Sequence, residues 1–202
     1  MLKNSEVGKG FSSALGRLLA WIPIDPNAIT ILSVVLAILG YAVFDSAPQT
    51  KVLSIIFFIL AFFFDAVDGA IARAKNLTSR EGAFLDGISD RLVEFFLILA
   101  LLKFAVGEYS TLLVVILFFG TAMTAFVKAY AEHSQLMKHE EAAKMPGVLE
   151  RTERSLLLLA ALILFTFQRF DIFAIDLYAT AILSVLTFLQ RFVIVFYHDD
   201  KF

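Results

Sequence analysis

Four aspartates stand in two pairs within the apolar and mixed stretch FFFDAVDGAIARAKNLTSREGAFLDGISDRLVE. Asp65 and Asp68 are three residues apart and Asp86 and Asp90 are four apart, so each pair shares one face of a helix. Oxygen-only ligands suit hard divalent cations such as Mg²⁺ or Mn²⁺, which often join carboxylates to phosphate oxygens. The pattern therefore indicates a divalent-metal site that acts on a phosphorylated substrate.

Small and basic residues accompany these carboxylates. Gly69 follows Asp68, and Gly82 lies four residues before Asp86, so a ligand or a neighbouring backbone can approach closely at both positions. Arg73 adds a fixed cation that suits a phosphate or a metal-bound diphosphate.

A buried salt-bridge network is the alternative interpretation. Its cations would be Arg73, Lys75, Arg80 and Arg91. Carboxylates inside membrane spans are costly and usually functional, and four of them on adjoining helices favour the metal site.

The elements that position these residues must lie in lipid. The 202 residues are 59% hydrophobic, include 22 Phe and have a mean hydropathy of +0.82, which a soluble domain of this size could not bury. The chain has no cysteine, which excludes disulfides, thiolate metal sites and cysteine nucleophiles. The histidines at 133, 139 and 198 lack zinc-ligand spacing.

A span needs about 20 mostly apolar residues, and six stretches qualify. They are 27–45, 51–74, 82–104, 108–131, 152–168 and 172–197. Residues 1–21 fit an amphipathic helix in the interface, with Phe11, Leu15, Leu18 and Leu19 facing lipid. We therefore expect an all-α integral membrane protein in which 1–202 form a single domain, with the bundle over 22–202.

Basic residues predict the orientation of the bundle. Ten lie on one side against three (Lys51, Lys103 and Arg169) on the other. The ten are Lys3, Lys9, Arg17, Lys75, Arg80, Lys138, Lys144, Arg151, Arg154 and Lys201. This asymmetry places both termini, and the site near the inner ends of the second and third spans, on the cytoplasmic side of the cell membrane.

The aspartate region resembles the signature of the CDP-alcohol phosphotransferase family, D-x2-D-G-x2-A-R-x8-G-x3-D-x3-D. The matching positions are Asp65, Asp68, Gly69, Ala72, Arg73, Gly82, Asp86 and Asp90. The resemblance implies an enzyme with six spans, an interfacial N-terminal helix, cytoplasmic termini and a homodimeric assembly.

The resemblance also implies roles for individual residues. Asp65, Asp68 and Asp86 would hold one or two Mg²⁺ or Mn²⁺ ions on the diphosphate, and Asp90 would take the acceptor's proton and also touch metal. The CDP moiety would contact Asn27, Ala28, Ile29, Thr30, Gly69, Ala72, Arg73, Ser79 and Gly82. The first four belong to a P-N-x-[IV]-T segment that can equally be a helix start with a proline.

Basic residues on three helices suggest an anionic acceptor. They are Lys128, Arg151, Arg154 and Arg191. The set resembles the phosphatidylinositol-phosphate and archaetidylinositol-phosphate synthase branch, with Glu150–Arg154 as its E-R-x-E-R segment. This implies transfer from CDP-diacylglycerol or CDP-archaeol to inositol 1-phosphate with release of CMP. Glycerol phosphate, serine or CDP-inositol stay open as substrates. Snorkelling at the membrane interface is the alternative role for these cations, and it fits Lys128 well and Arg191 less well.

Two other classes of protein are compatible with intramembrane carboxylates. A divalent-cation transporter would place them near the midplane and would leave Gly69, Ala72 and Arg73 unexplained. A non-catalytic scaffold would not need every signature position. We therefore expect an enzyme whose partners are lipids and a phosphorylated polyol, and no nucleic acid.

Overall fold

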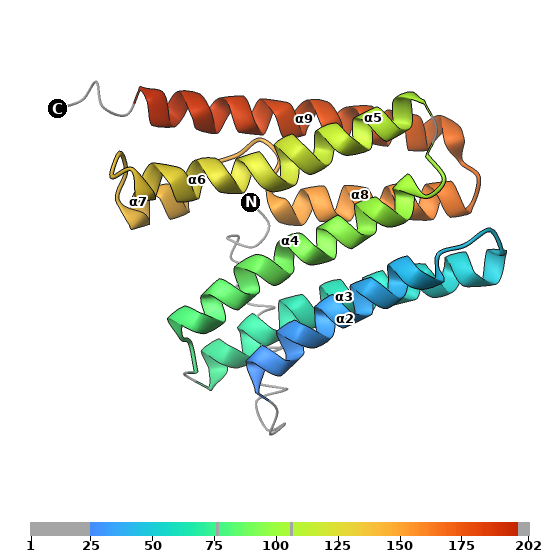
Figure 1. Ribbon diagram of the computed structural model, residues 1–202, viewed down its shortest axis with the longest axis horizontal. Coiled ribbons are helices and arrows are strands. Elements are labelled where there is room, and N and C mark those ends of the chain that lie inside the picture. The colour runs from blue at the N-terminus through green and yellow to red at the C-terminus, as the bar shows by residue number, and fades with distance from the viewer. Residues whose placement is uncertain (1–24, 76, 106, 198–202) are drawn as a thin grey trace. The chain divides into compact units, whose positions relative to one another are not determined.

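The structure is a computed structural model that describes residues 25–75, 77–105 and 107–197. The predicted interfacial helix over 1–21 lies outside these ranges. Every regular element in the described ranges is helical (Figure 1). The chain divides into two compact units, Met1–Lys103 and Phe104–Phe202.

The first unit contains three described helices, α2 (Pro26–Val43), α3 (Pro48–Ala74) and α4 (Arg80–Leu102). Local chemistry explains where they begin. The Asp25 carboxylate accepts from the Asn27 amide at 3.0 Å ahead of Pro26, and the Ser79 hydroxyl accepts from the Gly82 amide at 2.9 Å. Side-chain oxygens at these positions satisfy amides that the first helical turn leaves unpaired.

Helix α2 packs against both α3 and α4. Gly40 makes close approach to α3 possible, because a Cβ there would lie 3.0 Å from the Phe58 ring. Ser54 of α3 donates to the Gly40 carbonyl at 2.7 Å. At the other end of α4, Lys103 donates to the carbonyl of Phe44 at 3.1 Å, which caps the C-terminal end of α2.

Among its described residues, the second unit contains one long helical run and three further helices. The run is α5 (Glu108–Val115), the π-helical segment η2 (Ile116–Met123) and α6 (Thr124–His133). It is followed by α7 (His139–Lys144), α8 (Arg151–Thr166) and α9 (Phe170–Phe196). Helix α9 packs against α5, η2, α6 and α8.

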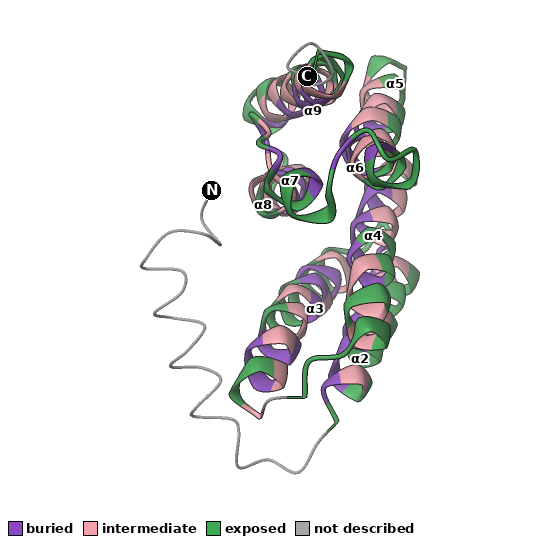
Figure 2. Cartoon of the chain, turned by 90° about the vertical axis from the view of Figure 1, so that its left-hand side faces the viewer, coloured by how far each residue is buried: buried purple, intermediate pink, exposed green. Residues whose placement is uncertain are grey.

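Buried polar residues run along α9. They are Thr180, Ser184, Thr187 and Arg191. Figure 2 shows that the long helices carry buried residues along one side and exposed residues along the other. In a membrane protein the exposed sides are apolar, which leaves polar groups for the interior of each unit.

Each of the six predicted spans corresponds to a helix or helical run in the structure. Four of them are long and apolar enough to cross a membrane: Pro26–Val43, Pro48–Ala74, Glu108–His133 and Phe170–Phe196. Helix α8 has 16 residues, which is short for a span, and α4 carries charged residues over its first half.

Candidate active site

Three of the four aspartates come together in the first unit. Asp65 of α3 and Asp86 and Asp90 of α4 each offer a carboxylate oxygen, and these oxygens lie within 4.8 Å of one another. Asp90 is buried, whereas Asp65 and Asp86 are partly buried. The predicted pairing of carboxylates across two helices is therefore present for these three.

The Asp68 carboxylate is not one of these three and lies in the adjoining pocket, whose lining it shares with Asp86. The Thr30 hydroxyl of α2 and the backbone amide of Gly69 both donate to it, and Asp68 is 3% exposed. Residues three apart on an α-helix differ by about 60° in direction. Asp65 therefore faces the cluster while Asp68 faces α2.

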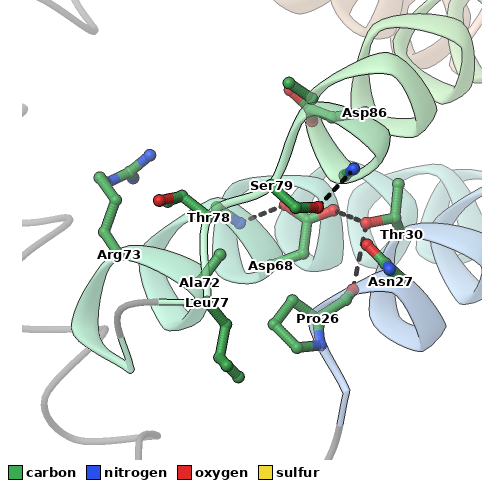
Figure 3. A pocket seen from close by; sticks show the side chains of 13 residues that line it. Pro26, Asn27, Thr30, Asp68, Ala72, Arg73, Leu77, Thr78, Ser79 and Asp86 are labelled. Carbon is green, nitrogen blue, oxygen red and sulfur yellow. Dashed lines mark hydrogen bonds between the residues drawn. The ribbon is translucent and has the colours of Figure 1, made fainter.

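A pocket adjoins Asp68, between the C-terminal end of α3 and the starts of α2 and α4. Figure 3 shows Thr30 and Asp68 pointing toward one another, with Ser79 beside them. The pocket is lined by Pro26, Asn27, Thr30, Asp68, Gly69, Ala72, Arg73, Leu77, Thr78, Ser79, Gly82, Ala83 and Asp86. Asp86 thus lines the pocket and also belongs to the acidic cluster.

Seven of the nine residues predicted to contact the CDP moiety line this pocket, and two do not. Ala28 is exposed, and Ile29 packs in an apolar cluster with Val67 and Ile71. The pocket adds Pro26, Leu77, Thr78 and Ala83 to the predicted set. Helical periodicity could have shown that Ala28 and Ile29 do not line the pocket, because residues 27 and 30 share a helix face on which 28 and 29 do not lie.

Two glycines keep this pocket open. A Cβ on Gly69 would lie 3.2 Å from Nη1 of Arg73. A Cβ on Gly82 would lie 3.1 Å from the Ser79 hydroxyl and 3.3 Å from Oδ1 of Asn27. Any larger residue would press on polar groups that line the pocket.

The acidic cluster fits a divalent cation. Its donor atoms are carboxylate oxygens only, the ligand type that Mg²⁺ and Mn²⁺ prefer. Two oxygens across one ion, each bound at about 2.0–2.5 Å, lie about 4–5 Å apart. The spacing of up to 4.8 Å among Asp65, Asp86 and Asp90 matches that requirement. One ion pair of the alternative salt-bridge interpretation is present. Arg91, whose side chain is half-exposed, lies 3.6 Å from the Asp90 carboxylate.

Sequence reasoning missed one further acidic residue. Glu94 lies one helical turn beyond Asp90 and is 1% exposed, so α4 carries a series of carboxylates at positions 86, 90 and 94. The four-residue spacing was the available signal, although Glu94 lies outside the family signature.

The four predicted acceptor-binding cations all lie in the second unit. Arg151 and Arg154 occupy the first turn of α8, and Arg154 is 4% exposed. Lys128 of α6 donates to the Ala143 carbonyl at 3.4 Å.

Arg191 is engaged by several protein groups around it. Its guanidinium donates to the carbonyls of Pro146 at 3.3 Å and Thr124 at 3.0 Å, and to the Glu150 carboxylate at 3.2 Å. Glu150 is the residue just before α8, so these bonds place Arg191 beside the start of that helix. The Leu149 amide also donates to the Thr187 hydroxyl at 2.9 Å, which ties the same loop to α9.

This chain belongs to the CDP-alcohol phosphatidyltransferase family, because the sequence model of that family matches residues 24–193. It is accordingly an enzyme that transfers phosphate-containing groups, as the signature predicted. A relative from Pyrococcus horikoshii, an archaetidylinositol phosphate synthase, is 29% identical over 177 residues, which cover 88% of this chain and 86% of the relative.

A phosphatidylinositol phosphate synthase from Mycobacterium marinum is 32% identical over 157 residues, which cover 74% of this chain and 62% of the relative. Among solved structures, the Mycobacterium tuberculosis phosphatidylinositol phosphate synthase in complex with manganese and citrate superposes with a TM-score of 0.74. It shares 24% sequence identity, and the match covers 92% of this chain and 88% of that one. The same enzyme with CDP-DAG bound also has a TM-score of 0.74. These two structures support the fold.

Proposed function

We propose that this enzyme transfers a phosphatidyl-type group from CDP-diacylglycerol or CDP-archaeol to the hydroxyl of a phosphorylated polyol, inositol 1-phosphate, and releases CMP. One observation carries the proposal. Asp86 belongs to an acidic cluster suited to a divalent cation and also lines a pocket that contains polar groups. A metal-bound diphosphate whose nucleotide part occupies the pocket would use both features. Relatives named as archaetidylinositol and phosphatidylinositol phosphate synthases support the choice of substrates.

The four aspartates would bind the metal ions from two directions. Asp65, Asp86 and Asp90 would hold one or two Mg²⁺ or Mn²⁺ ions, and Asp68 would complete the set from the pocket side. Such ions, when bound, neutralise the diphosphate and the charge that develops on the leaving CMP. The Thr30 hydroxyl and the Gly69 amide hold the Asp68 carboxylate at the boundary between cluster and pocket.

Asp90 would act as the general base. The acceptor's hydroxyl oxygen attacks the phosphorus that carries the lipid alcohol, and a new P–O bond forms there. The bond to the bridging oxygen breaks, CMP leaves with the electron pair, and the hydroxyl proton passes to Asp90. A carboxylate held at a fixed distance from the hydroxyl can do this although it is a weak base in water.

The pocket would bind the CDP moiety. Asn27 offers an amide and Ser79 a hydroxyl to the nucleotide, and the Arg73 guanidinium suits its phosphates. The two glycines leave room for these contacts, and Ala72 lines the same pocket.

Lys128, Arg151, Arg154 and Arg191 would receive the acceptor's phosphate. Arg151 and Arg154 project from the first turn of α8, where the helix dipole also favours an anion. The contacts of Arg191 with Glu150 and with two carbonyls indicate that part of its role is to hold the start of α8 in place.

We further propose that the chain crosses the cell membrane six times as one catalytic domain, with cytoplasmic termini, a cytoplasm-facing active site and a homodimeric assembly. The asymmetry of the basic residues supports the orientation. Accessibility labelling of single cysteines in this cysteine-free chain would test the topology directly.

CMP release tests the proposed reaction. Purified protein with Mg²⁺, CDP-diacylglycerol and a panel of inositol phosphate, glycerol phosphate and serine should release CMP fastest with inositol phosphate. Asp90→Asn should reduce release by about 10²–10⁴-fold. Asp171→Asn, which alters the exposed Asp171 at the start of α9, is the matched control and should retain full activity. Undiminished release by the Asp90 variant would refute the base assignment, and preference for serine would refute the phosphorylated acceptor.

A further inference from the structure

The π-helical segment η2 is a feature for which the proposed reaction has given no reason. It interrupts an otherwise α-helical run from Glu108 to His133. π-Helical turns are rare and occur frequently at functional sites. Gly120 lies within this segment, and Gly120 and Thr121 are buried there.

Three helices of the second unit meet at Gly120. A Cβ on this residue would lie 2.8 Å from the Ser184 hydroxyl of α9 and 2.9 Å from Cδ of Arg154 of α8. Carbon atoms do not approach one another this closely, so no side chain fits unless a neighbour moves. Ser184 and Arg154 are 0% and 4% exposed, so neither has free space toward solvent.

The contact with Arg154 is made by Cδ, the carbon next to the guanidinium. Cδ is bonded directly to Nε of the guanidinium, so a displacement of Cδ moves the charged group with it. A buried arginine cannot easily take another rotamer, because interiors are closely packed. The position of the Arg154 guanidinium therefore depends on residue 120 being a glycine, which has no side chain.

The same helical run also holds Arg191. The carbonyl of Thr124, four residues after Gly120, accepts from Arg191 at 3.0 Å. Arg191 in turn donates to Glu150, the residue that precedes α8, at 3.2 Å. Two sets of contacts thus hold the start of α8 against this run: the packing of Arg154 on Gly120, and the bonds of Arg191 to Thr124 and Glu150.

We propose that Gly120 is a positioning residue for the acceptor's phosphate, because its lack of a side chain sets the place of the Arg154 guanidinium. This inference rests on the proposed function, in which Arg154 binds that phosphate. Recognition of a phosphate by the planar guanidinium fork depends on geometry, so a small shift weakens it.

Gly120→Ala tests this in the full-length enzyme. The KM for inositol phosphate should rise about tenfold, since misplacing a binding group by about 1 Å can cost up to 10²-fold. The KM for the CDP-linked donor should stay unchanged. Gly40→Ala is the matched control, because its new Cβ would lie 3.0 Å from the Phe58 ring in the other unit. That variant should lose thermal stability as Gly120→Ala does, yet keep both KM values.

A double-mutant cycle with Arg154→Ala shows whether the effect passes through the arginine. Arg154→Ala alone should raise the acceptor KM, and adding Gly120→Ala should raise it no further. Ser184→Ala removes the hydroxyl at 2.8 Å and leaves the contact with Arg154, so Gly120→Ala/Ser184→Ala should keep the raised KM. This double variant also serves if Gly120→Ala alone does not fold.

Two results would overturn the inference alone: an unchanged acceptor KM in Gly120→Ala while Arg154→Ala raises it, or recovery of the wild-type KM in Gly120→Ala/Ser184→Ala. An unchanged acceptor KM in Arg154→Ala would refute both the inference and the proposed acceptor site. Both would also fail if the wild-type enzyme accepted none of the phosphorylated alcohols.

Discussion

Arg191 offers the sharpest test of how the second unit is held together. Its side chain is 6% exposed, and its guanidinium donates to Pro146, Thr124 and Glu150. Arg191→Ala would leave two carbonyls without these donors and a carboxylate without this cation. We expect the variant to be strongly destabilised even in the absence of substrate.

The expected loss can be worked out from these bonds. A hydrogen bond to a charged group contributes about 1.5–3 kcal/mol. Breaking a buried ion pair costs about 3–5 kcal/mol, but the Glu150 side chain is 31% exposed, which lowers the share of the ion pair. We therefore expect a loss of about 3–5 kcal/mol. For a chain of this size that corresponds to a fall in apparent Tm of roughly 6–20 °C.

Thermal unfolding of the purified protein in detergent measures this loss. Arg191→Lys keeps the charge but cannot reach three acceptors with a planar fork, so it should recover only part of the stability. Arg169→Ala is the control, because the Arg169 side chain is 59% exposed and its 3.8 Å ion pair lies at the other end of α9. That control should change stability by less than about 0.5 kcal/mol. An Arg191→Ala variant as stable as wild type would refute the structural role and leave acceptor binding as the reason for this arginine.

Three further predictions concern the first unit. Thr30→Val should lower stability by about 1.5–3 kcal/mol because the buried Asp68 carboxylate loses a donor, and Thr30→Ser should not; unfolding of both variants measures this. EDTA should abolish CMP release, and added Mn²⁺ or Mg²⁺ should restore it; release that persists after chelation would contradict the metal proposal. Gly82→Ala should raise the KM for the CDP-linked donor by roughly three- to tenfold while the acceptor KM stays constant, because its Cβ would press on Ser79 and Asn27. Steady-state kinetics with each substrate varied in turn would show a different pattern if this pocket does not bind the donor.

The helices of this protein could be predicted from its sequence because lipid imposes simple rules. A chain that crosses hydrocarbon must satisfy its backbone within helices, so long apolar runs mark their positions. The start of α2 was also readable, since Pro26 favours the first turn, whereas α3 and α4 begin at Pro48 and Arg80, ahead of the predicted positions 51 and 82. The spacing of Asp65, Asp86 and Asp90 was enough to predict a cluster, because helical periodicity fixes which residues share a face.

Interactions between helices could not be read in the same way. The sequence placed Asp68 with the other three carboxylates, but packing of α2 against α3 brings Thr30 within reach of it. Periodicity shows which face of its own helix a residue occupies. Only the tertiary structure decides which neighbour meets that face.

The proposed acceptor site in the second unit also depends on contacts between helices that the sequence does not reveal. From the sequence, Arg191 was predicted to bind the acceptor's phosphate, and Gly120 was one small residue among apolar neighbours. The packing of η2, α8 and α9 engages Arg191 with two carbonyls and Glu150 and brings Gly120 against Arg154. The signature residues along the chain, through their resemblance to the family, thus indicated the class of reaction. The close packing of helices, which depends on contacts between distant residues, decided how the charged groups are held.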